Sequence, residues 1–313
     1  MNILRELFEI QTVQVLLATF NGSNHLDEFL VSLMKQSNVN IYLTISDDGS
    51  TDNTLSIIHK YKNCFENVEV TQGPQRGAKE NFIHLLSLAK LEYVALADQD
   101  DIWDANHLEN SVLRIERYRD LPVLTFCAVN ILNEKSAFKS STWPRKNLAL
   151  TLKEFSFENH AKGCTMVMNR KFVQIYQGHD KSIIMHDWWL ALIAITSGIL
   201  VYEPSPEITY RLHESNLIGN GPNLTQRFCK ILASFRHREW APLNQLISLK
   251  SIFGPGMDMV DSTYLQKFEL AQMPNGFKFR RTLAFSKGRY RTKIIDEIIV
   301  RMALLARWNL EQK

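Results

Sequence analysis

The stretch LEYVALADQDDIW, residues 91–103, decides the fold that we predict for this chain. Its first half, Tyr93 to Ala97, is apolar and uncharged, which is typical of a strand buried on both faces of a mostly parallel sheet. Three carboxylates follow within four positions, those of Asp98, Asp100 and Asp101. A parallel strand delivers the residues after its last position to the ligand-binding edge of the sheet. The carboxylates are therefore predicted to lie at that edge.

Two interpretations of the acidic run are open when it is considered alone. In one, Mg²⁺ or Mn²⁺ binds there together with a diphosphate, because these cations prefer oxygen ligands and often retain waters and substrate phosphates. In the other, the run is an acidic turn that caps a helix beginning near Asp104. Neighbouring carboxylates repel one another unless a cation or donor hydrogens offset their charge. The remainder of the chain favours the metal–diphosphate interpretation.

The composition predicts a globular protein with one large domain, or a domain with an appendage, since 45% of its 313 residues are hydrophobic. Cys64, Cys127, Cys164 and Cys229 are far apart and form no CxxC pair, which disfavours a zinc site or a disulfide framework and fits a reducing cytoplasm. The N-terminal sequence lacks the charged-then-apolar order of a signal peptide. The apolar tract 183–202 contains His186, Asp187 and Gly198, so we expect a buried helix and strand there and no membrane span.

Strands alternate with helices through the first third of the chain. Expected strands cover residues 13–19, 41–46, 68–71 and 93–97, and expected helices cover 24–36, 52–61 and 78–90. This alternation predicts an α/β fold, a mostly parallel twisted sheet with right-handed crossovers and helices on both faces. Ligands bind at the carboxyl ends of such strands, which here are residues 19–22, 47–50 and 98–101.

The pattern is less regular in the second half. Further strands are expected at residues 123–129, 163–168, 199–202 and 207–212, and a helix at 186–196. Between the first two, the polar stretch 133–160 predicts a surface excursion that could shape an acceptor pocket. Beyond Gly219 the sequence predicts mostly helix.

Several separated motifs resemble one family. VLLATFNG at 15–22, SDDGSTDNT at 46–54 and ADQDD at 97–101 resemble the nucleotide-sugar half of the family 2 glycosyltransferases of the GT-A fold. GCTMVMNR at 163–170, HDWWL at 186–190 and YRLHESNLIG at 210–219 resemble its acceptor half, and are most similar to bacterial rhamnosyltransferase-like members. The resemblance implies a GT-A domain over 1–219, with the nucleotide-sugar half at about 12–103 and the acceptor half at about 104–219, then a helical, basic extension over 220–313.

The resemblance assigns nucleotide-sugar binding to the first two motifs and to the turn after the third strand. Its expected residues are Thr19, Phe20, Asn21, Asp47, Asp48, Arg76 and Asp98. Phe20 stands where the family often has Tyr beside the nucleobase, so the ring can stack but offers no hydroxyl; a core aromatic is the alternative. Asp47 or Asp48 would accept the imide N–H of uracil or thymine, which distinguishes these bases from cytosine. The alternative is a capping turn, for which Ser50 or Asp52 is the better cap. An exposed Arg76 that is merely solvated is likewise open.

The metal site implied by the resemblance uses Asp100 as a ligand of Mn²⁺ or Mg²⁺, with Asp98 near the ribose and Asp101 holding the loop. His213 matches a position where GT-A enzymes often bring a His toward the metal or diphosphate, and a purely structural His is the alternative.

Asp187 is the expected catalytic base. It stands at the start of an apolar helix, whose N-terminus favours an ionised carboxylate, although a plain helix cap is the alternative. Inverting transfer requires a base within hydrogen-bond reach of the acceptor hydroxyl. The family usually has Glu-Asp here, whereas this chain has His186-Asp187. Trp188 and Trp189 are expected to offer an aromatic face to the acceptor sugar, or to belong to the core.

The resemblance implies a cytoplasmic, metal-dependent, inverting glycosyltransferase of the hexosyltransferase class. Its donor would be dTDP-rhamnose or a UDP-sugar. Its acceptor would be a growing bacterial glycan, such as O-antigen, lipopolysaccharide or capsule, or a lipid-linked precursor. The choice between UDP and dTDP, the linkage and the oligomeric state are open at this stage.

The C-terminal segment combines basic, aromatic and aliphatic residues. Basic residues crowd into 278–293, and the next segment places Ile294, Ile295, Ile298, Ile299, Met302 and Leu305 along one helical face. This pattern predicts peripheral contact with an anionic inner-membrane surface, or packing on the catalytic body or a second subunit.

Two other functional classes share parts of this sequence pattern. A non-catalytic nucleotide-binding or scaffold protein shares the fold, but the presence of both Asp100 and Asp187 disfavours it. Nucleic-acid binding would explain the basic tail, but the net charge is only +3 and an apolar face follows the tail. The sequence therefore favours an enzyme that binds no nucleic acid.

Overall fold

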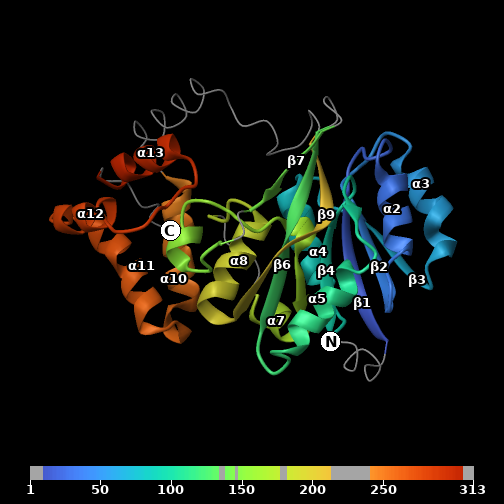
Figure 1. The fold of residues 1–313 in the computed structure, drawn as a ribbon, viewed down its shortest axis with the longest axis horizontal. Helices are drawn as coiled ribbons and strands as arrows, with labels where there is room; N and C mark the ends of the chain where they lie inside the picture. Colours follow the sequence, from blue (N-terminus) through green and yellow to red (C-terminus); the bar gives the residue numbers. More distant parts are fainter. Residues whose placement is uncertain (1–9, 134–137, 145–146, 177–181, 213–239, 306–313) are drawn as a thin grey trace. The chain divides into compact units, whose positions relative to one another are not determined.

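The computed structural model describes residues 10–133, 138–144, 147–176, 182–212 and 240–305 (Figure 1). The chain divides into two compact units. We call the first, residues 1–148, 161–178 and 198–213, the sheet unit, and the second, residues 149–160, 179–197 and 214–313, the helical unit. The predicted domain boundary at 219–220 lies outside the described residues.

The sheet unit is built on a nine-stranded mixed sheet of order β3-β2-β1-β4-β8-β6-β9-β5, with β7 paired to β6 (Figure 1). Its strands are β1 (Gln11–Thr19), β2 (Val39–Asp47), β3 (Asn67–Gln72), β4 (Tyr93–Asp98), β5 (Ile102–Trp103), β6 (Val123–Asn133), β7 (Phe138–Trp143), β8 (Val167–Asn169) and β9 (Ile199–Leu212). The first four strands are parallel, as predicted. The sheet then changes direction, since β8 is antiparallel to both β4 and β6.

Helices cover both faces of this sheet. They are α2 (Leu26–Met34), α3 (Thr54–Tyr61), α4 (Ala78–Ser87), α5 (His107–Glu116) and α7 (Arg170–Ile175), with short 3₁₀ turns at η1 (Lys62–Cys64) and η2 (Gly163–Thr165). Leu17 of β1 joins one core cluster with Leu30 of α2 and Val112 of α5. On the opposite face, the Gln14 amide donates to the carbonyl of Leu88 at the end of α4, at 3.0 Å. Alternate β1 residues thus pack against different helices.

The strand register aligns the carboxyl ends of β1, β2 and β4 with one another. Thr19 of β1 pairs with Asp47 of β2, and Ala18 pairs with Asp98 of β4. The Asp48 amide then donates to the Thr19 carbonyl at 2.8 Å. The residues that follow these three strands therefore form one edge, which is where the sequence placed them.

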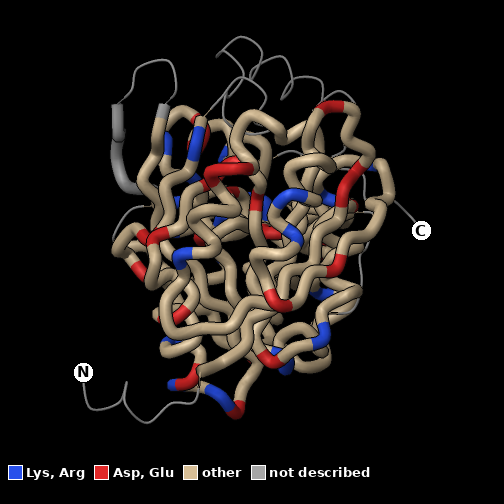
Figure 2. Tube along the Cα trace, turned by 90° about the vertical axis from the view of Figure 1, so that its right-hand side faces the viewer, with Lys and Arg blue, Asp and Glu red and all other residues tan. Residues whose placement is uncertain are grey.

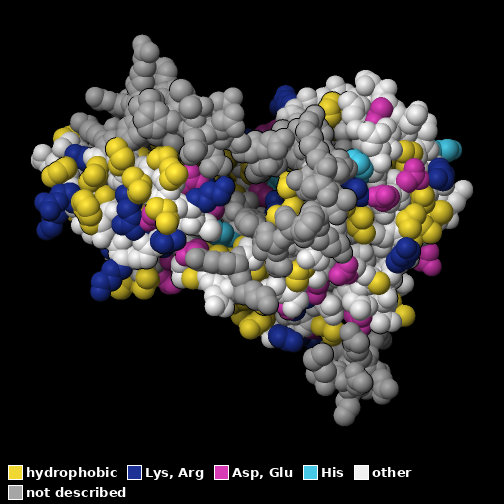
Figure 3. Space-filling view, turned by 45° about the horizontal axis from the view of Figure 1, so that its top comes forward, with side chains coloured by type: hydrophobic (Ala, Val, Ile, Leu, Met, Phe, Trp, Pro, Cys, Tyr) yellow, Lys and Arg dark blue, Asp and Glu magenta, His cyan; other side chains and the backbone are white. Residues whose placement is uncertain are grey.

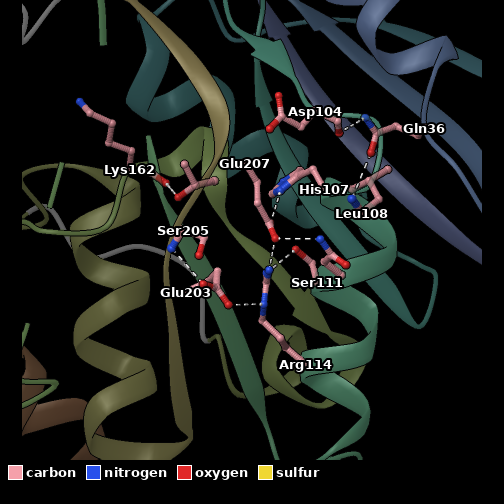
Figure 4. Close-up of polar contacts among 12 residues, drawn as sticks. Gln36, Asp104, His107, Leu108, Ser111, Arg114, Lys162, Glu203, Ser205 and Glu207 are labelled. Atoms are coloured by element: carbon pink, nitrogen blue, oxygen red, sulfur yellow. Dashed lines mark hydrogen bonds and ion pairs between the residues drawn. The ribbon is translucent and has the colours of Figure 1, made fainter. Parts of the chain in front are cut away.

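A buried polar network joins α5 to β9 (Figure 4). The Glu207 carboxylate accepts from His107 Nδ1 at 3.1 Å and from Asn110 Nδ2 at 3.0 Å, and it forms an ion pair with Arg114. Arg114 also lies 3.5 Å from the carboxylate of Glu203. Burial alone would raise the pKa of Glu207, but the hydrogen bond from His107 and the charge of Arg114 outweigh it, so that pKa is lowered. The network fixes α5 to strand β9 of the sheet.

Two predicted elements differ in the structure. The strands expected at 199–202 and 207–212 form the single strand β9, whose pairing with β6 shifts register around Ala128. Pro204 and Pro206 lie opposite this irregularity and have no N–H to donate. The strand expected at 163–168 is instead the η2 turn followed by the short β8.

The helical unit stacks successive helices against one another. They are α6 (Leu152–Phe155), α8 (His186–Ser197), α10 (Ala241–Phe253), α11 (Met259–Gln272), α12 (Phe277–Ala284) and α13 (Ile294–Leu305), with the 3₁₀ turn η3 (Gly254–Gly256) after α10. Contacts join α6 to α8, α8 to α10, and each later helix to the next. An aromatic group of Phe157, Trp240 and Tyr290 links the start, middle and end of this unit. No helix in the described ranges has the length and apolarity needed to cross a bilayer.

Candidate functional site

Asp47 organises the turn after β2. Its Oδ2 accepts from the hydroxyls of Thr19 at 2.8 Å and Ser50 at 2.7 Å, and its Oδ1 accepts from the amides of Ser50 at 2.8 Å and Gly49 at 3.2 Å. A carboxylate offers about four acceptor positions, so these four bonds fill them. Asp47 therefore serves the turn, which was the alternative to base recognition, and it has no acceptor position left for an imide N–H. Its side chain holds the ends of β1 and β2 together.

Asp48 shapes the turn after β3. Its Oδ1 accepts from the amide of Gln75 at 2.6 Å, and its Oδ2 accepts from the amide of Gly77 at 2.8 Å. Gln75 and Gly77 both have positive φ, which explains why this turn needs a carboxylate brace. The exposed Arg76 lies between the two braced residues. Asp48 thus fixes the backbone that carries Arg76, and it retains acceptor positions that Asp47 lacks.

Asp52, one of the two residues that the sequence favoured as a cap, binds the first turn of the short helix α3, whose N-cap position is Asn53. Asp52 accepts from the Thr54 amide at 3.0 Å and from the Ser23 amide at 3.0 Å. Burial opposes ionisation, but these hydrogen bonds outweigh it and lower the pKa of Asp52 to about 2. Asp52, and neither Asp47 nor Asp48, therefore serves the start of this helix.

Gln99 ties the acidic run to the turn after β1. Its side chain accepts from the Phe20 amide and donates to the Phe20 carbonyl, each at 2.9 Å. A Cβ added to Gly22 would lie 2.1 Å from Gln99 Oε1, so the pairing requires glycine there. Asn21, at φ 47°, accepts from the Thr51 amide at 2.8 Å. The Phe20 ring is 55% exposed, which rules out the core-aromatic alternative.

The four residues of the acidic run differ in burial. Asp98 and Asp100 are half-buried, whereas Asp101 is fully buried. Burial, followed by the charges of Asp100 and Asp98, raises the pKa of Asp101 well above its usual range. The Asp101 carboxylate contacts the Cys164 thiol and accepts from the Arg211 amide at 3.4 Å. Asp101 thus holds the loop from inside, as expected.

These residues fit a divalent cation. Ligand atoms of Asp98, Asp101 and Cys164 lie within 4.8 Å of one another. Oδ2 of Asp101 is enclosed and meets no N–H or O–H donor among the described residues. Oxygen ligands suit Mg²⁺ and Mn²⁺, and the charge repulsion that raises the pKa of Asp101 would fall beside a cation. Burial raises the pKa of Cys164, so its thiol is neutral and a weaker ligand than the carboxylates.

Three residues near the acidic run were missed by sequence reasoning. Arg211 donates from Nε to the Asp100 carbonyl at 3.1 Å and pairs with Glu28 of α2. Lys162 places its ammonium 3.8 Å from the ring centre of Tyr210. Burial, then the charges of the carboxylates of Asp98, Asp101 and Asp100, raises the pKa of Tyr210. Tyr210 and Arg211 open the motif YRLHESNLIG, and Lys162 directly precedes GCTMVMNR, but neither motif assigns a role to these residues.

His213, the other expected metal ligand, lies outside the described residues. Its predicted role stays a prediction.

The expected catalytic base lies in the first turn of α8 in the helical unit. Asp187 is 7% exposed, and its Oδ1 accepts from the Trp188 amide at 2.7 Å. Burial lowers the pKa of His186, with the charge of Asp187 opposing this, so the imidazole is neutral at pH 7. The Asp187 carboxylate therefore has a neutral neighbour in the position where the resemblance expects Glu.

Both tryptophans of the motif are buried. Trp188 donates from Nε1 to the Phe155 carbonyl at 2.6 Å, and the Trp189 ring centre is 6.3 Å from that of Phe253. Trp189 is only 2% exposed, which makes it a core residue of the helical unit. The core alternative thus describes their place in this structure, and an acceptor role stays a prediction.

Comparison with known families identifies the family of this chain. The model of the family described as "Glycosyl transferase family 2" matches residues 14–175, just over half of the chain. The chain belongs to this family. The glycosyltransferase is also 28% identical over 310 residues to the dTDP-rhamnosyl transferase RfbG of Shigella flexneri, covering 92% of this chain and 99% of that protein.

Solved structures agree on the fold. The crystal structure of S. aureus TarS 1–349 superposes with a TM-score of 0.56 at 17% identity, covering 93% of this chain and 78% of that one. A mannosyltransferase from Pyrobaculum calidifontis, in complex with GDP-Man and Mn²⁺, superposes with a TM-score of 0.52 at 14% identity, covering 93% and 85%. The glycosyltransferase therefore has the GT-A fold that its motifs predicted, and its rhamnosyltransferase-like resemblance is confirmed.

Proposed function

We propose that this glycosyltransferase moves a hexose, with inversion, from dTDP-rhamnose or a UDP-sugar to a growing bacterial cell-surface glycan. The observation that carries the proposal is the shared sheet edge at which Asp48 follows β2, Asp98 ends β4 and Asp100 follows it. Two features support the donor class. The relative along nearly the whole chain is named as a dTDP-rhamnosyl transferase, and S. aureus TarS is solved with UDP and with UDP-GlcNAc.

The donor-binding role is divided among the strand ends. The exposed Phe20 ring would stack on the base, and Asp48 would accept the imide N–H. Thr19 and Asn21 would hold the surrounding turns, as their bonds to Asp47 and Thr51 indicate. Arg76 would pair with the diphosphate from its braced turn.

Asp100 would ligate Mn²⁺ or Mg²⁺, with His213 as a further ligand and Asp98 near the ribose and the metal. A bound divalent cation would neutralise charge on the leaving diphosphate. The P. calidifontis mannosyltransferase is solved with Mn²⁺, which supports this assignment. Asp101 and Arg211 would keep the loop in place, since they contact it from inside.

Asp187 would take the proton of the acceptor hydroxyl. As that proton leaves, the acceptor oxygen bonds to the anomeric carbon, and the bond from this carbon to the diphosphate breaks with its electron pair departing on the nucleotide. A general base of this kind contributes roughly 10²- to 10⁴-fold to a rate. Trp188 and Trp189 would act on the acceptor by fixing α8.

O-antigen, other lipopolysaccharide units or capsule are the proposed acceptor classes, as free glycans or lipid-linked precursors at the inner face of the cytoplasmic membrane. A cytoplasmic location is supported by Cys64, Cys127 and Cys164, which are free thiols.

Calorimetric titration with UDP, dTDP and GDP, each with and without Mn²⁺, tests the donor half. We expect metal-dependent binding of UDP or dTDP that Asp100→Ala abolishes and that Asp104→Ala, its matched control, preserves. Asp104 is exposed, and its backbone carbonyl accepts from the side-chain amide of Gln36 at 2.9 Å. Equal binding by the two variants would contradict the metal-site assignment, and the absence of any binding would favour the non-catalytic alternative.

A further inference from the structure

The last two helices of the helical unit expose an unusual number of apolar side chains. Phe277 and Phe285, at either end of α12, are 56% and 72% exposed, and along α13 the side chains exposed by half or more are Ile294, Ile295, Ile298 and Met302. The α13 residues are spaced i, i+1, i+4 and i+8, so they form one stripe. At 1.5 Å per residue this stripe is about 12 Å long.

Exposed charges in the same segment have one sign. Across residues 277–305 the exposed ionisable side chains are Lys278, Arg281, Lys287, Arg289 and Lys293. The acidic residues of the segment are turned inward. Glu297 is buried and accepts from Arg301 at 2.6 Å, and half-buried Asp296 lies 3.4 Å from Arg291. Elsewhere, Figure 2 shows acidic and basic residues interspersed along the trace.

Hydrogen bonds connect the two helices that carry these apolar and basic side chains. Arg301 of α13 donates to the carbonyls of Ala284 and Gly288, at 2.7 and 2.6 Å, and so closes the connection between α12 and α13. Tyr290 donates from its hydroxyl to the Leu283 carbonyl at 2.9 Å. In Figure 3, yellow apolar and dark blue basic side chains lie side by side at the left of the view. We call the exposed residues named in the two preceding paragraphs the basic–apolar face.

We propose that the basic–apolar face is the surface by which this protein binds an anionic lipid bilayer. Aliphatic and aromatic side chains that enter the headgroup region, with basic side chains against acidic headgroups, are the two components of interfacial binding. This inference rests on the proposed function in one respect, which is that a lipid-linked acceptor would lie at the membrane. Binding to the bilayer itself requires no sugar transfer.

Charge decides between a bilayer and other occupants. In a two-fold dimer the same patch meets its own copy, which would oppose basic side chains to basic side chains. A nucleic acid would satisfy the basic residues but leave the isoleucine stripe in water. An anionic bilayer satisfies both groups at once.

Co-sedimentation with vesicles tests the proposal. The full chain should bind vesicles of phosphatidylglycerol and phosphatidylethanolamine, bind phosphatidylcholine vesicles weakly, and lose binding as salt is raised, because headgroup attraction is screened. Lys278→Gln with Arg281→Gln should weaken partitioning roughly 30-fold, at about fivefold for each charge near the surface. Ile295→Ser with Ile298→Ser should weaken binding even at low salt.

The matched control is Leu55→Ser with Val70→Ser, two exposed apolar residues of the sheet unit, 49% and 45% exposed. This variant should bind vesicles like the wild type. The proposal would be overturned if the wild type and both face variants bound anionic vesicles equally, or if none of them bound. It would also be overturned if the face variants dissociated an oligomer, seen as a change in the sedimentation coefficient of the free protein. Nucleotide binding, measured on the same samples, reports separately on the proposed donor site.

Discussion

Asp47 and Asp48 are neighbours whose carboxylates serve different structures. Asp47 accepts four bonds within the ends of β1 and β2, whereas Asp48 accepts two from the turn that carries Arg76. A base-reading carboxylate needs an unused acceptor position, and only Asp48 retains one. Of the two, we therefore propose Asp48 as the residue that would distinguish uracil or thymine from cytosine.

We expect Asp48→Asn to reduce this discrimination. A hydrogen bond to a charged acceptor contributes about 1.5–3 kcal/mol, and an amide both weakens the bond and offers a donor that suits cytosine. The ratio of the dissociation constant for UDP to that for CDP should thus rise at least about tenfold. A purely structural role in the turn would weaken both nucleotides equally and leave the ratio unchanged.

Asp187→Asn should separate binding from catalysis. The amide keeps the shape of the side chain but cannot take a proton, so the transfer rate should fall roughly 10²- to 10⁴-fold with nucleotide affinity unchanged. Asp261→Asn is the matched control, since Asp261 also lies in the first turn of a helix of the helical unit. A transfer rate for Asp187→Asn equal to that of the control would remove Asp187 as the base.

For single residues, the sequence predicts which of them lie close together but not which hydrogen bonds their side chains form. Motif position placed Thr19, Asp47 and Asp98 correctly at one edge. The free acceptor positions of Asp48 and the bidentate contact of Gln99 depend on turn geometry and on residues far along the chain. No pattern within a motif encodes those partners.

Among the elements, α5 and β9 depend on each other through charge. Arg114 and Glu207 are 8% and 7% exposed, and Glu207 also accepts from His107. Removing one partner of a buried ion pair leaves the other charge without compensation, which costs about 3–5 kcal/mol. Replacing both with neutral groups costs less for the same reason.

Arg114→Leu should therefore lower the free energy of unfolding by about 3–5 kcal/mol, and adding Glu207→Gln should restore part of that loss. Urea denaturation of the two variants and the wild type measures this difference. A double variant less stable than Arg114→Leu alone would show that the pair contributes through packing and not through its charges.

Element prediction from the sequence succeeded where periodicity is long and uninterrupted. Helices α2, α3 and α4 and strands β1 to β4 lie within the predicted ranges or a few residues of them. The antiparallel β8 was not foreseen, because a three-residue strand carries no directional signal. The joining of two predicted strands into β9 depends on its partner β6, which local sequence does not specify.

For the whole molecule, stability should respond to pH through His186. Burial lowers its pKa in the folded state below the usual 6.5. As the pH falls through 6.5 the unfolded chain takes up this proton and the folded chain does not, so stability decreases in acid. The loss per group is at most about 1.4 kcal/mol for each pH unit.

His186→Gln should remove that contribution, so its free energy of unfolding should change less between pH 7.5 and 5.5 than that of the wild type. His59→Gln, which alters an exposed residue of α3, should keep the wild-type pH dependence. Urea unfolding at the two pH values provides the measurement. Identical pH dependence in all three proteins would show that His186 titrates normally.

The contact between Gly22 and Gln99 has a consequence for the history of this family. A side chain at position 22 would occupy the space of the Gln99 amide, 2.1 Å away, and a shorter residue at 99 would release the backbone of Phe20. A residue larger than glycine at position 22 would thus displace the Gln99 amide and break its two bonds to Phe20. Among relatives that diverged from a common ancestor, we expect these two positions to change together, so that drift at one is conditional on compensation at the other.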